Sequence, residues 1–312
     1  MMAPSTALRE TADRPQVWLT GAYRQMLFIR EFDLRLAELV AASYDVARFI
    51  HLSCGQEAVA VGACAAADDR DLLCVTYRGH GTLLARGADP VRMIVEILGR
   101  PGGYQKGLGG SMHLAATELG IIDSAAIVGG NLPIAVGAGL KLKAAGEGGA
   151  VLCFFGDGAT ATGSFHESLN LAALLKLPVV FICENNRRSS RSAFATYSPV
   201  ERVADRANAY GMHSVVVDGS DVDAMRAAVT DSRRRAVSGA GPVLVEAEVE
   251  LLTGHFADSQ AGLQQDVPGD PVQLCREHLH QVLGETADAQ LAAIESEVRR
   301  SVALAFVAAG AR

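Results

Sequence analysis

Hydrophobic residues recur along this chain with two different patterns, and each pattern predicts a kind of element. Helical spacing is clear over residues 23–42, and helices are also predicted over residues 56–67, 90–98, 132–145, 164–175 and 221–237 and from Pro271 onward. Short apolar runs predict buried strands over residues 72–76, 150–155, 178–183, 215–217 and 243–249. Continuous apolar strands joined by helices are typical of parallel sheets covered on both faces. The predicted fold class is therefore α/β: a doubly wound, mostly parallel sheet with helices on both faces and helical extensions at both ends.

The domain organisation predicted from the sequence is simple. Residues 1–20 are rich in polar side chains of both charge signs and are expected to form a flexible arm. Residues 21–312 are expected to form one domain with a C-terminal helical tail. Two segments, 77–81 and 99–113, are predicted loops; the second holds six glycines in fifteen positions, too many for a helix interior.

Composition narrows the class of protein. The 312 residues are 49% hydrophobic and 20% charged, with a formal net charge of −7, which argues against a nucleic-acid partner. No apolar run approaches the roughly 20 residues of a membrane span, and the N-terminus lacks the apolar core of a signal peptide. We therefore expect a cytoplasmic protein with no membrane partner. The six cysteines are scattered without a C-x-x-C pair, so we expect reduced thiols in the core.

Two short polar motifs follow neighbouring predicted strands. Gly156-Asp157-Gly158 comes after the strand at 150–155, and Asn185-Asn186 comes after the strand at 178–183. Open parallel sheets bind ligands at this edge. The Asp157 carboxylate and the Asn186 amide oxygen suit Mg²⁺, while glycine lets the backbone approach a phosphate at a helix N-terminus. The pattern indicates a site for a metal and a diphosphate. A dinucleotide fold is the competitor, but no G-x-G-x-x-G occurs at this turn.

The spacing of these motifs is specific. GDG, 26 residues and then NN resembles the fingerprint of thiamine diphosphate (ThDP) enzymes. The chain also resembles the alpha subunits of the two-subunit 2-oxo acid dehydrogenases, the family of pyruvate, branched-chain 2-oxo acid and acetoin dehydrogenases, from about residue 20 to about residue 280. The matching segments are residues 50–62 (IHLSCGQEAVAVG), 77–81 (YRGHG), 109–113 (GGSMH), 127–130 (IVGG), 165–173 (FHESLNLAA) and 176–186 (KLPVVFICENN).

The resemblance implies a role for each matching residue. It implies ThDP and Mg²⁺ as cofactors, with the metal held by Asp157, Asn186 and the backbone carbonyl of Arg188. It implies His51 and His255 as active-site histidines that bind or protonate a substrate-derived group. The implied contacts to the cofactor's diphosphate are Tyr77, Arg78, Gly158 and Ala159, and those to its aminopyrimidine are Ala126, Ile127 and Val128.

The resemblance also implies an activity and a partner. The family decarboxylates 2-oxo acids or cleaves acetoin, and it passes the acyl unit to the lipoyl group of an acyltransferase. The glutamate that activates the cofactor belongs to a beta subunit. We therefore expect an α2β2 heterotetramer that acts on a 2-oxo acid substrate, with this chain as the alpha subunit.

Several positions depart from the family pattern and leave alternatives open. The family's asparagine and glutamate after GDG are here Ala161 and Thr162, an arginine has become Leu251, and Arg188 replaces a tyrosine in a loop with three arginines. A second hypothesis is a ThDP-dependent carboligase or acyl transferase that uses an aldehyde or ketone acceptor. A third is a non-catalytic structural or regulatory subunit.

The remaining histidines have other expected roles. His80 and His113 could each contact the site or brace a loop. His166 is expected to be a packing residue on a helix face, and His213, His278 and His280 are expected to be ordinary surface or core residues.

Overall fold

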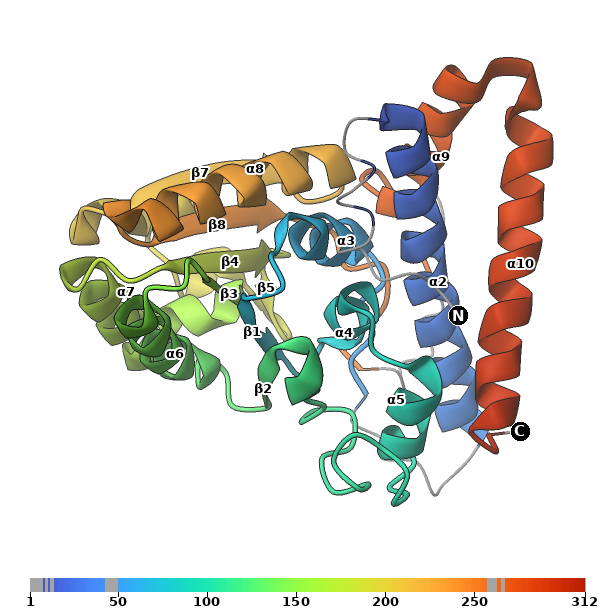
Figure 1. Ribbon diagram of the computed structural model, residues 1–312, viewed down its shortest axis with the longest axis horizontal. Helices are drawn as coiled ribbons and strands as arrows, with labels where there is room; N and C mark the ends of the chain where they lie inside the picture. Colours follow the sequence, from blue (N-terminus) through green and yellow to red (C-terminus); the bar gives the residue numbers. More distant parts are fainter. Residues whose placement is uncertain are drawn as a thin grey trace.

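A six-stranded parallel sheet forms the centre of the molecule (Figure 1). The computed structural model describes residues 8, 11, 14–42, 50–256, 263–264 and 267–311. The strand order is β2-β1-β3-β4-β8-β7, and every pair of neighbours is parallel. The strands are β1 (Leu72–Thr76), β2 (Ile121–Ala125), β3 (Val151–Gly156), β4 (Val179–Asn185), β7 (His213–Asp218) and β8 (Val243–Glu248). This arrangement confirms the predicted α/β fold class.

Helices cover both faces of the sheet because the strands are apolar on both faces. Leu152 and Phe154 of β3 belong to a core shared with the N- and C-terminal helices, whereas Cys153 and Phe155 belong to a second core. In Figure 1, α6 and α7 lie on the side opposite α8. The helices are α2 (Pro15–Ala42), α3 (Glu57–Ala66), α4 (His80–Arg86), α5 (Pro90–Ile97), α6 (Asn131–Ala145), α7 (Gly163–Leu174), α8 (Val222–Arg235), α9 (Pro271–Leu283) and α10 (Ala287–Ala308).

The first and last long helices form an additional layer beside the sheet. Helix α2 packs against both α9 and α10, which run along the edge of the molecule in Figure 1. Arg30 of α2 binds Glu57 of α3 and donates to both carboxylate oxygens of Asp270, at 3.1 and 3.0 Å. Asp270 also caps α9 by accepting from Val272 N. One buried guanidinium thus joins three helices.

Helix α2 begins at Pro15, eight residues before the predicted start. Residues 15–20, expected to belong to the flexible arm, are therefore helical, and Trp18 is buried with its indole N–H donating to Asp223 at 2.6 Å. Only residues 8, 11 and 14 of the remaining arm lie among the described residues. The hydrophobic spacing missed this start because only Trp18 and Leu19 of residues 15–20 are buried, too few to show a helical period.

The loop predicted over residues 77–81 is only partly a loop. Its last two residues begin helix α4, which the glycine content of the segment concealed. Gly81 lies inside this helix in a crowded place, since an added Cβ would be 3.1 Å from Ser53 Oγ. Close packing, rather than backbone flexibility, accounts for this glycine.

Two predictions from the composition concern the cysteines and membrane-spanning segments. All six cysteines are buried and unpaired with one another, which confirms that they are core thiols. No helix in the described part of the chain is long and apolar enough to cross a membrane.

Candidate active site

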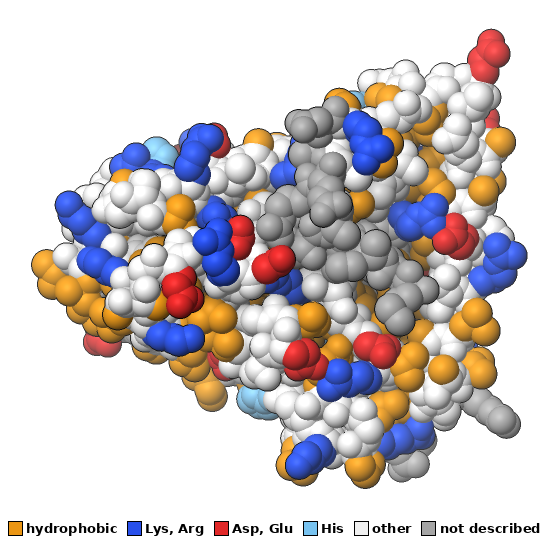
Figure 2. Space-filling model, in the orientation of Figure 1, with side chains coloured by type: hydrophobic (Ala, Val, Ile, Leu, Met, Phe, Trp, Pro, Cys, Tyr) orange, Lys and Arg blue, Asp and Glu red, His pale blue; other side chains and the backbone are white. Residues whose placement is uncertain are grey.

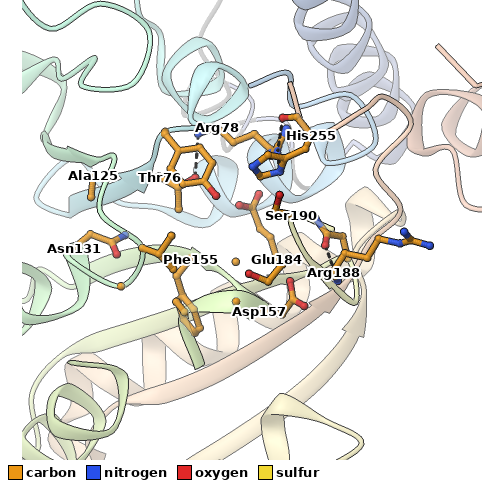
Figure 3. Close-up of a pocket in the computed structure, with 18 of the residues that line it drawn as sticks. Thr76, Arg78, Ala125, Asn131, Phe155, Asp157, Glu184, Arg188, Ser190 and His255 are labelled. Carbon is orange, nitrogen blue, oxygen red and sulfur yellow. Dashed lines mark hydrogen bonds between the residues drawn. The ribbon is translucent and has the colours of Figure 1, made fainter. Parts of the chain in front are cut away.

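The predicted site residues meet at the carboxyl ends of neighbouring parallel strands. Asp157 directly follows β3 and Asn186 directly follows β4, and the register places Gly156 opposite Glu184. With the segments that follow β1 and β2, these residues surround one cavity (Figure 3). The predicted residues that line it are Tyr77, Arg78, Ile127, Val128, Asp157, Gly158, Ala159, Asn186, Arg188 and His255.

Two of the predicted residues do not line this cavity. Ala126 lies between Ala125 and Ile127, both of which do. His51 is buried and packs against the ring of Tyr77, with centroids 4.2 Å apart. The structure therefore places His51 beside the site rather than on its wall.

The side of the cavity formed by β3 and β4 carries the oxygen atoms predicted to bind a metal. Asp157 is 1% exposed, and one carboxylate oxygen accepts from the Tyr197 hydroxyl at 2.5 Å. Burial raises the pKa of Asp157 to about 6. The Asn186 amide oxygen accepts from the backbone N–H of Arg188 at 3.0 Å, so the backbone at Arg188 lies close to the Asn186 side chain.

These donors fit Mg²⁺ bound together with a phosphate. Within the described residues no three His, Cys, Asp or Glu side chains converge on one point. Mg²⁺ takes one or two carboxylate or amide groups and fills its remaining positions with phosphate and water oxygens. A carboxylate that is destabilised by burial gains from a cation beside it.

Arg78 provides the positive charge on the opposite side of the cavity. Arg78 is 8% exposed, and its guanidinium donates to the Leu52 carbonyl at 2.6 Å and lies 3.4 Å from the Nδ1 and carbonyl oxygen of His255. Burial lowers the pKa of Arg78, and none of its hydrogen bonds to described residues goes to a carboxylate. A buried guanidinium whose hydrogen-bond partners are neutral suits an anion.

Gly158 allows the backbone after β3 to pass very close to the next loop. A Cβ at this position would lie 2.5 Å from Ser189 Oγ. Ser189 belongs to a small hairpin, β5 (Arg188–Ser189) and β6 (Ser192–Ala193), which forms the rim of the cavity. Arg187 and Ser190 adopt positive φ values of 58° and 53° within this rim, so the tight hairpin is built without glycine. Figure 3 shows the Arg188 side chain extending away from the cavity.

The two histidines predicted to be catalytic pack against each other and against Phe256. The rings of His51 and His255 are 5.1 Å apart, and Phe256 packs against both, at 4.9 and 4.5 Å. Burial and the Arg78 cation lower the pKa of His51 to about 3. The same two causes lower the pKa of His255. Both rings are therefore neutral at pH 7 and can accept a proton or a hydrogen bond.

The other histidines are placed as follows. His80 is fully buried and braces a loop: it lies 2.9 Å from an Asp33 oxygen and 2.9 Å from Ser111 Oγ. His113 is exposed and does not line the cavity. His166 on α7 pairs with the Tyr210 hydroxyl at 2.5 Å, in agreement with its expected packing role.

Several residues of the cavity wall were not predicted. Glu184 is 7% exposed, and burial raises its pKa to about 7, with Arg78 acting in the opposite direction. Asn131 begins α6 and donates to the Phe154 carbonyl at 2.6 Å, which fixes the helix to β3. Glu184 could have been predicted as a site residue, because it lies near the end of an apolar strand and directly before the NN motif. The unpredicted lining residues are Gln56, Thr76, Ala125, Gly129, Asn131, Phe155, Gly156, Glu184, Ser189 and Ser190.

Thr162 gives a structural account of one departure from the family pattern. It is the N-cap of α7: its hydroxyl oxygen accepts from Phe165 N at 3.3 Å and donates to the Ala159 carbonyl at 2.7 Å. Threonine is a favoured N-cap residue. The turn after GDG thus keeps a defined conformation.

Comparison with known proteins agrees with this geometry. The family model described as "Dehydrogenase E1 component" matches residues 23–312. The chain belongs to this family. The alpha subunit of an acetoin:2,6-dichlorophenolindophenol oxidoreductase from Bacillus subtilis is 41% identical over 287 residues, covering 90% of this chain and 85% of the relative. The pyruvate dehydrogenase E1 component subunit alpha of Rhizobium meliloti is 35% identical over 291 residues, covering 90% of this chain and 82% of the relative.

Among solved structures, the E1-family chain is similar to transketolase from Campylobacter jejuni. The TM-score is 0.57 at 17% identity, over 90% of this chain and 48% of the transketolase chain. At this identity the likeness concerns the fold alone. It agrees with the parallel sheet and helical layers described above, and this E1 alpha-type chain spans about half of that larger protein.

Proposed function

We propose that this E1-family chain binds the diphosphate of ThDP through Mg²⁺ and forms the alpha half of an enzyme that decarboxylates a 2-oxo acid or cleaves acetoin. The proposal rests on one arrangement. The buried Arg78 guanidinium, whose hydrogen-bond partners among the described residues are all neutral, lines the same cavity as the buried Asp157 carboxylate. A magnesium diphosphate complements both groups, because its phosphate oxygens pair with the guanidinium and its cation with the carboxylate.

The residues of this chain would hold the cofactor from two sides. Asp157, Asn186 and the Arg188 carbonyl would bind Mg²⁺, while Tyr77, Arg78 and the backbone N–H groups of the turn after β3 would bind the diphosphate. The main chain at Ala126, Ile127 and Val128 would meet the aminopyrimidine. When bound, ThDP supplies a nucleophilic carbon and an electron sink for cleavage of the bond next to the substrate carbonyl.

His51 and His255 would accept or donate protons near the reacting atoms. His255 lines the cavity, and its ring nitrogen Nδ1 faces Arg78. His51 packs beside it, and its buried Nδ1 has no hydrogen-bond partner within the described part of the chain. Two neutral imidazoles in contact can accept a proton or hold a hydroxyl group in one orientation. Both pKa values lie below the ordinary histidine value, which keeps these rings in the acceptor state at neutral pH.

The cavity is incomplete without a second chain, and we propose a beta subunit in an α2β2 heterotetramer. Ile127 and Val128 line the cavity and yet are 74% and 46% exposed. Leu171 and Leu174 of α7 are 41% and 74% exposed, and Figure 2 shows hydrophobic side chains on the part of the surface where α6 and α7 lie. Apolar side chains exposed at a site are typical of a surface that a partner covers. The beta subunit would supply the glutamate that activates the cofactor.

The relatives named above indicate the substrates to test first, which are acetoin and pyruvate-like or branched-chain 2-oxo acids. The acyl unit would pass to the lipoyl group of an acyltransferase partner, in the cytoplasm. The relatives do not favour the carboligase hypothesis. The retained Asp157, Asn186, Arg78 and His255 argue against a non-catalytic subunit.

The test is reconstitution of this chain with its beta-type partner, ThDP and Mg²⁺. Reduction of an artificial electron acceptor would be followed with acetoin, pyruvate and branched-chain 2-oxo acids in parallel. The proposal predicts reduction that requires substrate, ThDP and both subunits. A complex that binds ThDP and reduces the acceptor with none of these substrates would contradict the proposed activity.

A further inference from the structure

We propose that Asp33, on helix α2, is a positioning residue that holds Arg78 and the surrounding cavity wall in the geometry needed for a diphosphate. The proposal rests on the function proposed above and adds a residue that none of the motifs contains. Asp33 is 0% exposed. One of its carboxylate oxygens accepts from Ser53 N and Ser53 Oγ at 2.5 and 2.7 Å, and the other lies 2.9 Å from His80 Nδ1.

The first branch of this network leads to Arg78. Ser53, fixed by Asp33, directly follows Leu52, whose carbonyl accepts from Arg78 Nη1 at 2.6 Å. The same short segment carries His51, which packs against Tyr77 and His255. The position of Ser53 therefore sets the position of the Leu52 carbonyl, which accepts the shortest hydrogen bond that the Arg78 guanidinium donates.

The second branch leads to the ends of β1 and β2. His80 begins α4, and its Nε2 lies 2.9 Å from Ser111 Oγ in the glycine-rich segment. The next residue, Met112, has a carbonyl that accepts from Ser124 Oγ at 3.1 Å. The same hydroxyl, with its single proton, also lies 3.3 Å from the Thr76 carbonyl, and Thr76 lines the cavity. Hydrogen bonds from one carboxylate therefore reach two sides of the cavity wall.

A carboxylate suits the centre of this network. It only accepts, so it matches the Ser53 N–H, the Ser53 hydroxyl and an N–H at Nδ1 of His80, whose Nε2 then faces the Ser111 hydroxyl. Asparagine has the same shape but no charge, and its NH₂ group would face His80 Nδ1, so the ring proton would have to lie on Nε2 and point at Ser111. The charged hydrogen bonds that Ser53 donates would at the same time be replaced by weaker neutral ones.

Asp33 acts through its neighbours rather than on a ligand. Neither Asp33, His80 nor Ser111 lines the cavity. The expected effect of a change is therefore weaker cofactor binding through misplacement of Arg78.

The experiment uses the complex with the beta-type partner and measures ThDP affinity at saturating Mg²⁺ by calorimetry. We expect Asp33→Asn to raise the Kd of ThDP by about tenfold or more, the scale of one charged hydrogen bond. The matched control is Asp71→Asn. Asp71 is equally buried and accepts from Ala150 N and Arg233, but it lies at the amino end of β1, away from the cavity. The control should lower the melting temperature and leave the Kd within about twofold.

A second variant keeps the test decisive if Asp33→Asn does not fold. Ser111→Ala breaks only the second branch, at its contact with His80, and we expect a smaller rise in Kd of about threefold. If wild-type complex binds ThDP and both foldable variants bind it equally well, the positioning role is wrong while the proposed function stands. If wild-type complex does not bind ThDP, the proposed function itself fails, and this inference fails with it.

Discussion

The guanidinium of Arg78 lies 3.4 Å from both the Nδ1 and the carbonyl oxygen of His255, and this contact joins the end of β1 to the loop after β8. The proposed anion-binding group and the proposed proton-handling group therefore touch. Because the cation contributes to the lowered pKa of His255, an anion bound to Arg78 offsets that effect. Cofactor binding should thus raise the pKa of His255 toward its ordinary value and make the ring a better base.

The first prediction concerns His255 itself. His255→Ala leaves Arg78 its hydrogen bond to the Leu52 carbonyl, so ThDP affinity should change little. Turnover should fall by about 10²-fold or more, the usual effect of a lost acid–base group. Steady-state kinetics and ThDP titration of the same preparation separate the two effects. His113→Ala, at an exposed position outside the cavity, is the control and should retain wild-type turnover. Full turnover in His255→Ala would remove this residue from the mechanism.

A second prediction follows from the contact between Gly158 and Ser189. Gly158→Ala would place a Cβ 2.5 Å from Ser189 Oγ and push the rim hairpin away from the turn after β3. We expect ThDP affinity to fall by about tenfold or more, with a loss of stability of about 1–3 kcal/mol for the overpacked contact. Gly163→Ala is the matched control, because its nearest neighbour is Glu167 Oε1 at 3.9 Å. Equal affinity in the two variants would show that the hairpin does not support the cofactor.

A third prediction is a pH dependence of stability caused by His51. Its pKa is about 3 in the folded chain against 6.5 as the ordinary value. Between these values the unfolded chain binds a proton that the folded chain does not, so the free energy of unfolding falls as the pH falls below about 6.5. The loss from this residue should be about 1.4 kcal/mol at pH 5.5.

The measurement is urea unfolding of wild type and His51→Phe at pH 7.5 and 5.5. The variant keeps an aromatic ring and loses the titration, so the difference in stability between the two pH values should shrink by that amount. His213→Phe, on the exposed edge of β7, should keep the wild-type difference. An unchanged difference in His51→Phe would mean that this imidazole does not stay neutral in the fold.

A fourth prediction concerns the glycine-rich segment. The buried carboxylate of Glu96 accepts four backbone hydrogen bonds, from Gln105, Gly107, Gly109 and Gly110, at 2.8 to 3.3 Å. Glu96→Gln replaces one acceptor oxygen with a donor that faces N–H groups. We expect a loss of about 2 kcal/mol or more and faster amide hydrogen exchange confined to residues 99–113. Exchange unchanged in that segment would show that the loop is held by other contacts.

The sequence predicted strands β1, β3, β4, β7 and β8 but not β2, and it placed the GDG and NN motifs at the ends of neighbouring strands, for a physical reason. Strands such as 150–155 are buried on both faces, so their composition alone identifies them. Asp157 and Asn186 follow such strands directly, and parallel pairing then brings them to one edge. The rest of the site depended on contacts between distant segments. No local pattern indicates that Asp33 reaches Ser53 and His80, or that Trp18 packs on α8 through Asp223.

Helix α4 is another feature that depends on contacts between distant segments and that the local sequence did not predict. Its second residue is a glycine, Gly81, which argues for a loop on propensity alone. The segment is helical because Gly81 packs tightly against Ser53 and Ile29, and tertiary packing overrides propensity. Ala126 and His51 were assigned by resemblance, and the structure places them next to the cavity wall rather than in it.

The central claim is that Asp157 and Arg78 face each other across a site for magnesium diphosphate. The most direct measurement is calorimetric titration of ThDP into the reconstituted complex, with Mg²⁺ and with excess chelator, for wild type and Asp157→Asn. The account predicts binding by wild type that requires Mg²⁺, and no Mg²⁺-dependent binding by Asp157→Asn. Equal ThDP affinity in the two proteins, or wild-type binding that ignores the chelator, would contradict it.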